Sequence, residues 1–238
     1  MSWKTTTAVF ISLMMAALLV SCADVPSTGP TPPEFKAEYR VINADAALSG
    51  GAVTVDNATA GSLTGAGSAT SYQSWDSGSR AVKVNNETIT VSMDTDWKGS
   101  IVLLPQVDVD GTLVRSFMKV NERRIFDSPV SQEEVEGDDG TIQMVDTPRL
   151  RMINATDVTV DVSLQVAGEE VAVEEGIEPE DYAGYYFVEA VNYTLVVTDH
   201  DTGDELTTIS TGSLSPKRYT ALVWGAAGSV AGKTLADD

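Results

Sequence analysis

Apolar and polar residues alternate along much of the chain after residue 35. The alternation runs through four segments: Ala52–Asp56, Arg80–Val84, Thr88–Met93 and Val158–Val166. A period of two indicates half-buried β-strands, because successive side chains of a strand point to opposite faces of a sheet. No stretch of useful length shows the spacing of an amphipathic helix. The pattern therefore predicts an all-β fold.

Turn signals separate the predicted strands. Asp110-Gly111 lies between apolar stretches at residues 105–109 and 112–120, which is the short-range signature of a β-hairpin. Three glycines divide the later half of the chain in a similar way: Gly168, Gly203 and Gly212. We expect strands spaced as in a β-sandwich or a barrel.

The chain also contains an internal repeat. Three pairs of segments correspond in the same order: Tyr39–Ala44 with Leu150–Ala155, Tyr72 with Tyr185, and Ser100–Pro105 with Thr220–Gly225. The offset grows from 111 to 113 and then to 120, as insertions in loops would produce. Each copy spans about 100 residues, which is enough for a core of its own. We therefore predict two tandem antiparallel β-sandwich modules of the Ig-like or transthyretin-like kind.

This interpretation divides the chain into six parts. They are a lipoprotein signal peptide (1–21), a proline-rich tether (22–35), a first β-sandwich repeat (36–128), an acidic linker region (129–148), a second repeat (149–230) and a flexible tail (231–238). The tether holds four prolines between residues 23 and 34, and proline-rich chain is extended and semi-rigid. The linker region contains the acidic run 133–139.

The first 21 residues have the pattern of a secretory signal. Lys4 precedes an apolar run from Ala8 to Val20 that contains no acidic residue. The run is too short for a membrane-spanning helix, which needs about 20 apolar residues.

Cys22, the single cysteine of the chain, lies where this apolar run ends. Leu19-Val20-Ser21-Cys22 resembles the bacterial lipobox, in which a lipid is joined to the cysteine and the chain is cleaved just before it. Stable anchoring takes more than one acyl chain. The alternative is cleavage at the small residues 21–23, which would release a soluble protein. We expect lipidation of Cys22, and Ala23 in place of an aspartate favours the outer membrane.

The charge of the chain excludes one class of partner. Its 35 Asp and Glu residues outnumber 15 Lys and Arg residues, for a net charge of −20. Nucleic-acid binding depends on Lys and Arg displacing counterions, so we expect no nucleic-acid partner. Residues 227–234 match a relaxed phosphate-loop pattern, but Ala227 replaces its first glycine, so we expect no nucleotide and no cofactor.

Two groups of residues are candidate binding sites. Trp75 and Trp97 have polar neighbours and are the candidate ligand contacts, for example by stacking on sugar rings, whereas three other aromatic residues fit core packing better: Tyr72, Tyr185 and Trp224. Asp199, Asp201 and Asp204 are weak candidates for a calcium site. Calcium loops need six or more oxygen ligands, and Asp and Gly also dominate plain turns, so we favour a solvated hairpin tip and expect no metal.

The sequence contains few of the residues and motifs that are typical of catalytic sites. His200 is the single histidine, and no serine lies in a nucleophile elbow. A pair of carboxylates could hydrolyse glycosides, but an acidic chain always contains plausible pairs. We expect the protein not to be an enzyme.

A family resemblance rests on short motifs of both copies. Arg40 and Arg151 are each followed by two apolar residues and Asn-Ala, and the second copy ends in the strand-like segment Tyr219–Val223. These features are similar to the tandem extracytoplasmic domains of the domain-of-unknown-function 4397 family, over most of residues 37–230. The family usually continues Asn-Ala with a Ser-Pro-Asp type of turn, which is absent here. The resemblance implies a secreted or lipid-anchored β-sandwich repeat without catalytic residues to carry over.

These observations together predict a lipid-anchored protein of the bacterial cell envelope. We expect a non-catalytic binding or scaffolding role, with the membrane as one partner through the anchor and an envelope protein or a glycan as another. The alternative is a carbohydrate-binding or calcium-dependent adhesive module. A carboxylate-based glycoside hydrolase comes third.

Overall fold

The structure is a computed structural model that describes residues 35–237 apart from 129, 138 and 139. These residues form β-strands joined by turns, with no helix among them. The all-β fold predicted from the alternation is therefore confirmed. In this described part, no candidate for a membrane-spanning helix is found.

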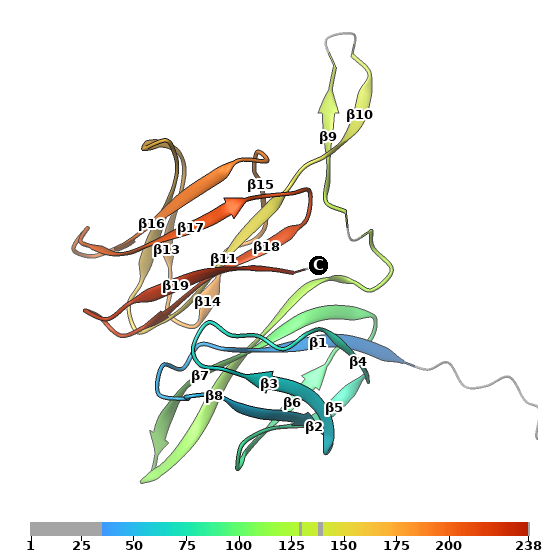
Figure 1. The fold of residues 1–238 in the computed structure, drawn as a ribbon, viewed down its shortest axis with the longest axis vertical. Helices are drawn as coiled ribbons and strands as arrows, with labels where there is room; N and C mark the ends of the chain where they lie inside the picture. The colour runs from blue at the N-terminus through green and yellow to red at the C-terminus, as the bar shows by residue number, and fades with distance from the viewer. Residues whose placement is uncertain (1–34, 129, 138–139, 238) are drawn as a thin grey trace, which may run out of the picture. The chain divides into compact units, whose positions relative to one another are not determined.

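Residues 35–128, called the first half below, form two four-stranded sheets (Figure 1). Their strand orders are β4-β1-β7-β8 for the inner sheet and β3-β2-β5-β6 for the outer sheet. The strands are β1 (Lys36–Asn43), β2 (Gly51–Val55), β3 (Ala58–Leu63), β4 (Gln73–Asp76), β5 (Gly78–Val84), β6 (Glu87–Met93), β7 (Trp97–Val109) and β8 (Thr112–Arg124). Buried apolar side chains of the two sheets enclose a first core.

The hairpin predicted at Asp110-Gly111 is confirmed, because these residues join β7 to β8. Their φ angles are 51° and 80°. A tight β-hairpin turn of type I′ requires positive φ at both central residues, and glycine adopts it without steric cost.

Residues 149–237, called the second half, form two further sheets. The inner sheet has the order β14-β11-β18-β19, with β15 also paired to β11, and the outer sheet has the order β13-β12-β16-β17. The strands are β11 (Arg149–Thr156), β12 (Val160–Val166), β13 (Glu169–Ile177), β14 (Asp181–Tyr182), β15 (Tyr186–Phe187), β16 (Asn192–Asp199), β17 (Glu205–Ser213), β18 (Arg218–Gly225) and β19 (Ala231–Ala236). A second core lies between them.

Each half contains one parallel strand pair, which the prediction of antiparallel sandwiches did not include. β1 runs parallel to β7, and β11 runs parallel to β18, whereas the other paired strands of these sheets are antiparallel. Parallel neighbours need a crossover connection. In each half, the strands of the outer sheet come between the two parallel strands in the sequence and form this connection.

The central strands β1 and β11 are buried on both faces. In β1, Val41 belongs to the first core and Ile42 to an apolar cluster shared by both halves. In β11, Met152 belongs to the second core and Ile153 to the same shared cluster. The two inner sheets therefore pack against each other, and each outer sheet covers the far side of its own inner sheet.

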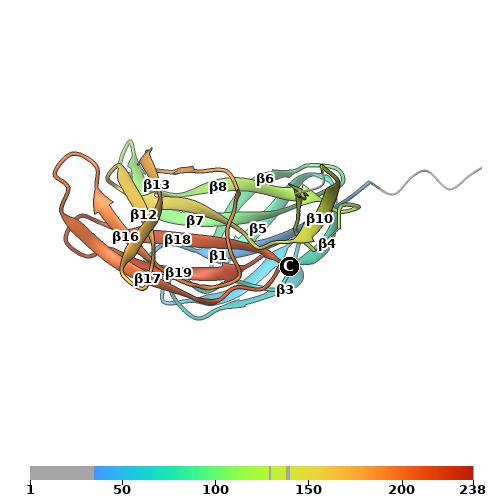
Figure 2. The ribbon, with the colours of Figure 1, turned by 90° about the horizontal axis from the view of Figure 1, so that it is seen from above.

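The prediction of a flexible tail at residues 231–238 is wrong. Ala231–Ala236 forms β19, which pairs with β18 (Figures 1 and 2). Asp237 is fully buried, and its N–H donates to the carbonyl of Arg218 over 2.9 Å. Small residues suggested mobility, but the segment completes the inner sheet by pairing along its length.

The acidic linker region contains a hairpin. β9 (Gln132–Glu136) pairs with β10 (Ile142–Asp146), and all five residues of β10 are exposed. Figure 1 shows this hairpin extending away from the four larger sheets.

Candidate functional site

The two halves meet through an apolar layer between their inner sheets. Ile42 and Val102 of the first half form one buried cluster with Ile153 and Leu222 of the second. Trp224 of β18 belongs to the same cluster. The predicted interior role of Trp224 is thus explained, because its ring is buried between the halves.

One arginine of each half enters this layer. Arg40 is on β1 and Arg151 is on β11. Nε of Arg40 donates to Oγ of Ser100 over 2.9 Å, and Nε of Arg151 donates to Oγ1 of Thr220 over 2.8 Å. Ser100 and Thr220 are the register partners of the arginines on the parallel strands β7 and β18. Each arginine is therefore oriented by a hydroxyl group from its own half, Ser100 for Arg40 and Thr220 for Arg151.

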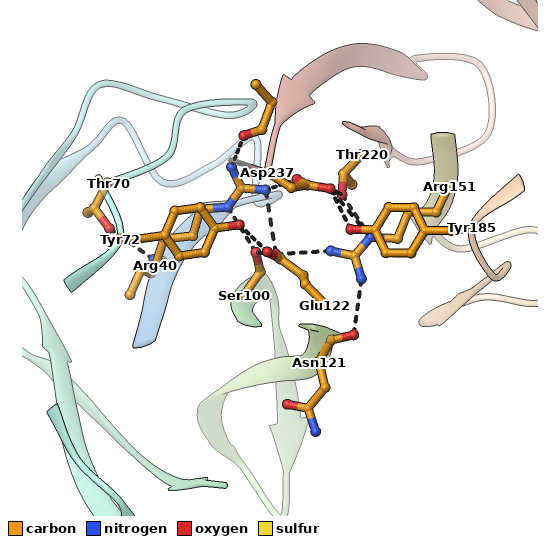
Figure 3. A network of polar contacts seen from close by, with 12 residues as sticks. Arg40, Thr70, Tyr72, Ser100, Asn121, Glu122, Arg151, Tyr185, Thr220 and Asp237 are labelled. Atoms are coloured by element: carbon orange, nitrogen blue, oxygen red, sulfur yellow. Dashed lines mark hydrogen bonds and ion pairs between the residues drawn. The ribbon is translucent and has the colours of Figure 1, made fainter. Parts of the chain in front are cut away.

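Each arginine also binds a carboxylate of the opposite half (Figure 3). Nη2 of Arg151 donates to Oε1 of Glu122 on β8 over 3.0 Å, and Nη2 of Arg40 donates to Oδ1 of Asp237 after β19. None of these four side chains is more than 4 % exposed. The ion pairs thus cross the interface in both directions.

A tyrosine of each half completes the arrangement. The guanidinium carbon of Arg40 lies 4.7 Å from the ring centroid of Tyr72, and that of Arg151 lies 4.8 Å from Tyr185. Each tyrosine hydroxyl donates to the carboxylate of its own half, over 2.6 Å for Tyr185. Both tyrosines are half-buried in this polar network and do not belong to either apolar core, so the expectation that they pack in the core is wrong.

Burial sets the protonation properties of this network. Burial raises the pKa of Glu122, the nearby Asp237 carboxylate raises it further, and the two arginines oppose both effects. Burial also raises the pKa of Tyr72 and Tyr185 well above the usual 10. The network links the two inner sheets through buried charge pairs, and the loss of one partner would leave an uncompensated buried charge.

A cavity of about 580 Å³ opens at one end of this interface. It lies where the loops after β1, β11 and β18 meet the distal part of β7. Most of its lining residues have small or apolar side chains: Ala44, Ala46, Ala47, Leu104, Pro105, Val107, Ala155, Pro179, Gly225 and Ala226. Because both halves supply lining residues, the cavity depends on how the halves pack.

Two aspartates in the cavity lining are engaged within the protein. Asp45 accepts hydrogen bonds from Nη1 of Arg115 and, over 2.8 Å, from the N–H of Ala47. Asp157 accepts a hydrogen bond from the N–H of Ala227 over 3.0 Å. These carboxylates stabilise the loops around the cavity.

The asparagines of the repeated Asn-Ala pair shape the cavity mouth. Oδ1 of Asn43 accepts the N–H of Asp45 over 2.9 Å, and Oδ1 of Asn154 accepts the N–H of Thr156 over 3.0 Å. Such side-chain turns mimic backbone turns. The alanine after each asparagine lines the cavity, so the motif has a local structural explanation.

Trp75 and Trp97, the predicted ligand contacts, lie elsewhere in the first half. Trp75 on β4 is half-buried and packs against the first core. Trp97 begins β7, and the guanidinium carbon of Arg124 lies 4.4 Å over its ring. Neither tryptophan lines the 580 Å³ cavity, and their role as ligand contacts stays a prediction.

The calcium candidates lie at the turn between β16 and β17. Oδ1 of Asp199 accepts the N–H of Asp201 over 2.9 Å and the N–H of Thr202 over 3.0 Å, and the carbonyl of Asp204 accepts the N–H of Asp199. Over the described residues, no group of three or more His, Cys, Asp or Glu side chains could hold a metal ion. The Asp199 contacts have the geometry of a turn.

His200 lies in the same turn and is exposed. Its Nδ1 lies 2.8 Å from Oδ1 of Asp161, and this hydrogen bond raises the pKa of His200. The histidine is not among the residues that line the cavity.

The predicted lipidation site, Cys22, lies outside the described residues. The internal repeat includes Arg40 and Arg151, whereas Glu122 and Asp237 were not predicted from the sequence. A usable signal was present, because the spacing between these two carboxylates falls within the range of offsets of the repeat.

A scan against known protein families and a search of curated proteins gave no match to this chain. The resemblance to the domain-of-unknown-function 4397 family therefore stays a prediction.

Proposed function

We propose that this chain is a lipid-anchored protein of the bacterial cell envelope with a non-catalytic binding role, and that its ligand occupies the 580 Å³ cavity between the halves. One observation carries the proposal: the cavity has the size of a ligand site, while the aspartates that line it already have partners within the protein. Ligand sites commonly measure roughly 300–1,000 Å³ and are mainly apolar.

The lining indicates the class of ligand. Alanines and other apolar residues form most of it, and Asp45, Asp157 and Glu180 are its charged members. An anionic ligand would be repelled by these carboxylates and by the net charge of −20. The favoured ligand is a small, mainly apolar molecule that is either neutral or positively charged.

The placement of the buried carboxylates supports binding rather than hydrolysis. A glycosidase needs two carboxyl groups that face one substrate, one as an acid and the other as a base or nucleophile. Glu122 and Asp237 instead pair with arginines inside the interface. Asp45 pairs with Arg115 beside the cavity. Carboxylates that are paired with arginines inside the fold do not face a common substrate, as the two carboxyl groups of a glycosidase must.

The proposal has two further parts, which concern the anchor and the relation between the two halves. The lipobox-like segment before Cys22 supports anchoring at the envelope, with the outer membrane as the favoured location. We also infer that the two halves are copies of one β-sandwich module. The matching strand orders, the parallel pair in each half and the equivalent arginines support this inference.

Binding can be tested by titrating the purified chain with the neutral apolar dye Nile red and following dye fluorescence. Ala226 is exposed at the cavity mouth, so Ala226→Trp should fill the cavity without disturbing either core. Ala58→Trp is the matched control, because Ala58 is exposed on β3 outside the cavity lining. We expect saturable binding that weakens at least tenfold in Ala226→Trp and stays within twofold in Ala58→Trp.

Equal dye affinity in both variants, or no binding by the wild type, would contradict a ligand site in this cavity. Anchoring needs a separate test. Cells fed a clickable fatty acid should label the wild type and fail to label Cys22→Ser. Wild-type protein that is unlabelled and released from cells would disprove the anchor while leaving the cavity result standing.

A further inference from the structure

The outer sheet of the second half has an exposed apolar edge. β13 is an edge strand, because β12 is its single neighbour within the sheet order β13-β12-β16-β17. Val171 is 56 % exposed and Val173 is 44 % exposed on this strand. An edge strand presents backbone N–H and C=O groups that can pair with another extended chain.

A groove runs beside this edge. Three cavities of about 470, 360 and 100 Å³ share the residues Phe187 and Val188. Val171 and Val173 of β13 border the first and the third of them, and Val135 and Val145 of the β9–β10 hairpin border the second. We call this continuous surface the β13–β15 groove.

At the corresponding edge of the first half, a side chain of β4 contacts the edge strand β3. Gln73 begins β4, and its Nε2 donates to the carbonyl of Ala60 on β3 over 3.0 Å. β4 has four residues, whereas β15 has two. Gln73 pairs with Tyr39 and Tyr186 pairs with Leu150, so Tyr186 occupies the equivalent register position. In the second half, β15 is shorter, and Phe187 and Val188 line the cavities that run along β13.

Charge defines what the groove can accept. Glu133, Glu169 and Glu189 line its cavities. Arg149 lies beside the groove, with its guanidinium carbon 4.2 Å from the ring centroid of Phe187. Nη2 of Arg149 donates to the carbonyl of Gln132. The carboxylates and the net charge of −20 oppose pairing with a second copy of the chain. They favour a basic partner, because complementary charge steers association and excludes like-charged partners.

We propose that the β13–β15 groove binds an extended basic segment of a partner protein, which adds to the edge of β13 as a further strand. The backbone pairs with β13, apolar side chains at alternate positions contact Phe187 and the exposed valines, and lysine or arginine side chains between them pair with the glutamates of the rim. In this mode of recognition, backbone hydrogen bonds supply affinity and alternate side chains supply specificity. The surface is separate from the 580 Å³ cavity, since the two share no lining residue.

The probe is a synthetic eight-residue peptide that alternates lysine and valine, titrated against the full chain by fluorescence anisotropy. Two control peptides replace either lysine by glutamate or valine by serine. We expect saturable binding of the lysine–valine peptide, with at least tenfold weaker binding of each control. No saturable binding of the lysine–valine peptide would overturn the proposal.

Variants locate the binding on the protein. Val173→Lys should weaken peptide binding at least tenfold, while Val109→Lys on the exposed end of β7 should change it less than twofold. The two variants change net charge equally, so a general charge effect would appear in both. Val171→Thr keeps a β-branched side chain at the edge, guards against a folding defect, and should weaken binding severalfold.

Equal effects of Val173→Lys and Val109→Lys would overturn the proposal in favour of diffuse electrostatic attraction. Sedimentation of the chain without peptide gives a second outcome. A dimer that Val173→Lys dissociates would also overturn it, because the occupant would then be a second copy of the chain.

Discussion

Nη2 of Arg151 donates a hydrogen bond to Oε1 of Glu122 over 3.0 Å, and both side chains are 1 % exposed. The arginine belongs to the second half and the glutamate to the first. The pair, together with Arg40 and Asp237, couples the packing of the two inner sheets to the balance of charge between them. The cavity at the end of this interface inherits its shape from that packing.

Removal of one charge from this network should destabilise the protein strongly. Glu122→Gln keeps the shape of the side chain but leaves two buried arginines with one carboxylate. Breaking a buried ion pair in this way costs about 3–5 kcal/mol. Urea unfolding should report this loss, whereas Glu205→Gln at an exposed position should change stability by less than about 0.5 kcal/mol. Similar midpoints for the two variants would mean that the network contributes little.

Stability should also fall with rising pH above about 10. Burial raises the pKa of Tyr72 and Tyr185 well above 10 and that of Tyr39 to about 12. In this range the unfolded chain loses tyrosine protons that the folded chain keeps, so each such group lowers stability by about 1.4 kcal/mol per pH unit until its folded pKa is reached. The stability contributed by these groups is fully present below pH 10. Urea midpoints measured at increasing pH should show the decline, and the double variant Tyr72→Phe, Tyr185→Phe should show a shallower one. An unchanged slope would contradict the burial of these hydroxyls.

Close packing between the halves can be tested at Gly67. Its φ is 72°, and an added Cβ would lie 2.6 Å from Cη2 of Trp224. Gly203 has a φ of 74° but nothing within 4 Å of its Cβ position, so Gly203→Ala should cost about 1–2 kcal/mol for the backbone alone. Gly67→Ala should cost about 1–3 kcal/mol more because of overpacking. Equal losses in thermal or urea unfolding would show that Trp224 does not pack on this glycine.

The strands with one solvated face were predictable because alternation is local. Ala52–Asp56 and Thr88–Met93 alternate in sequence, and β2 and β6 occupy most of these residues. The Asp110-Gly111 hairpin was predictable for the same reason, since a turn depends on its own residues.

Features that depend on distant parts of the chain were not predictable in this way. Residues 231–236 have no alternation, and they form β19 because β18 offers an edge for pairing. Asp237 then meets Arg40, which lies almost two hundred positions earlier in the chain. The repeat located both arginines, but single-sequence patterns do not show that β1 and β11 are buried on their second face.

The most direct test of the binding function is isothermal titration calorimetry of the chain with the neutral apolar probe 1-octanol at several temperatures. Burial of apolar surface gives a negative heat-capacity change on binding. We expect one site per chain with this signature in the wild type and in Ala58→Trp, and loss of binding heat in Ala226→Trp. Absence of binding to the wild type, or the same isotherm in Ala226→Trp, would contradict a ligand site between the two halves.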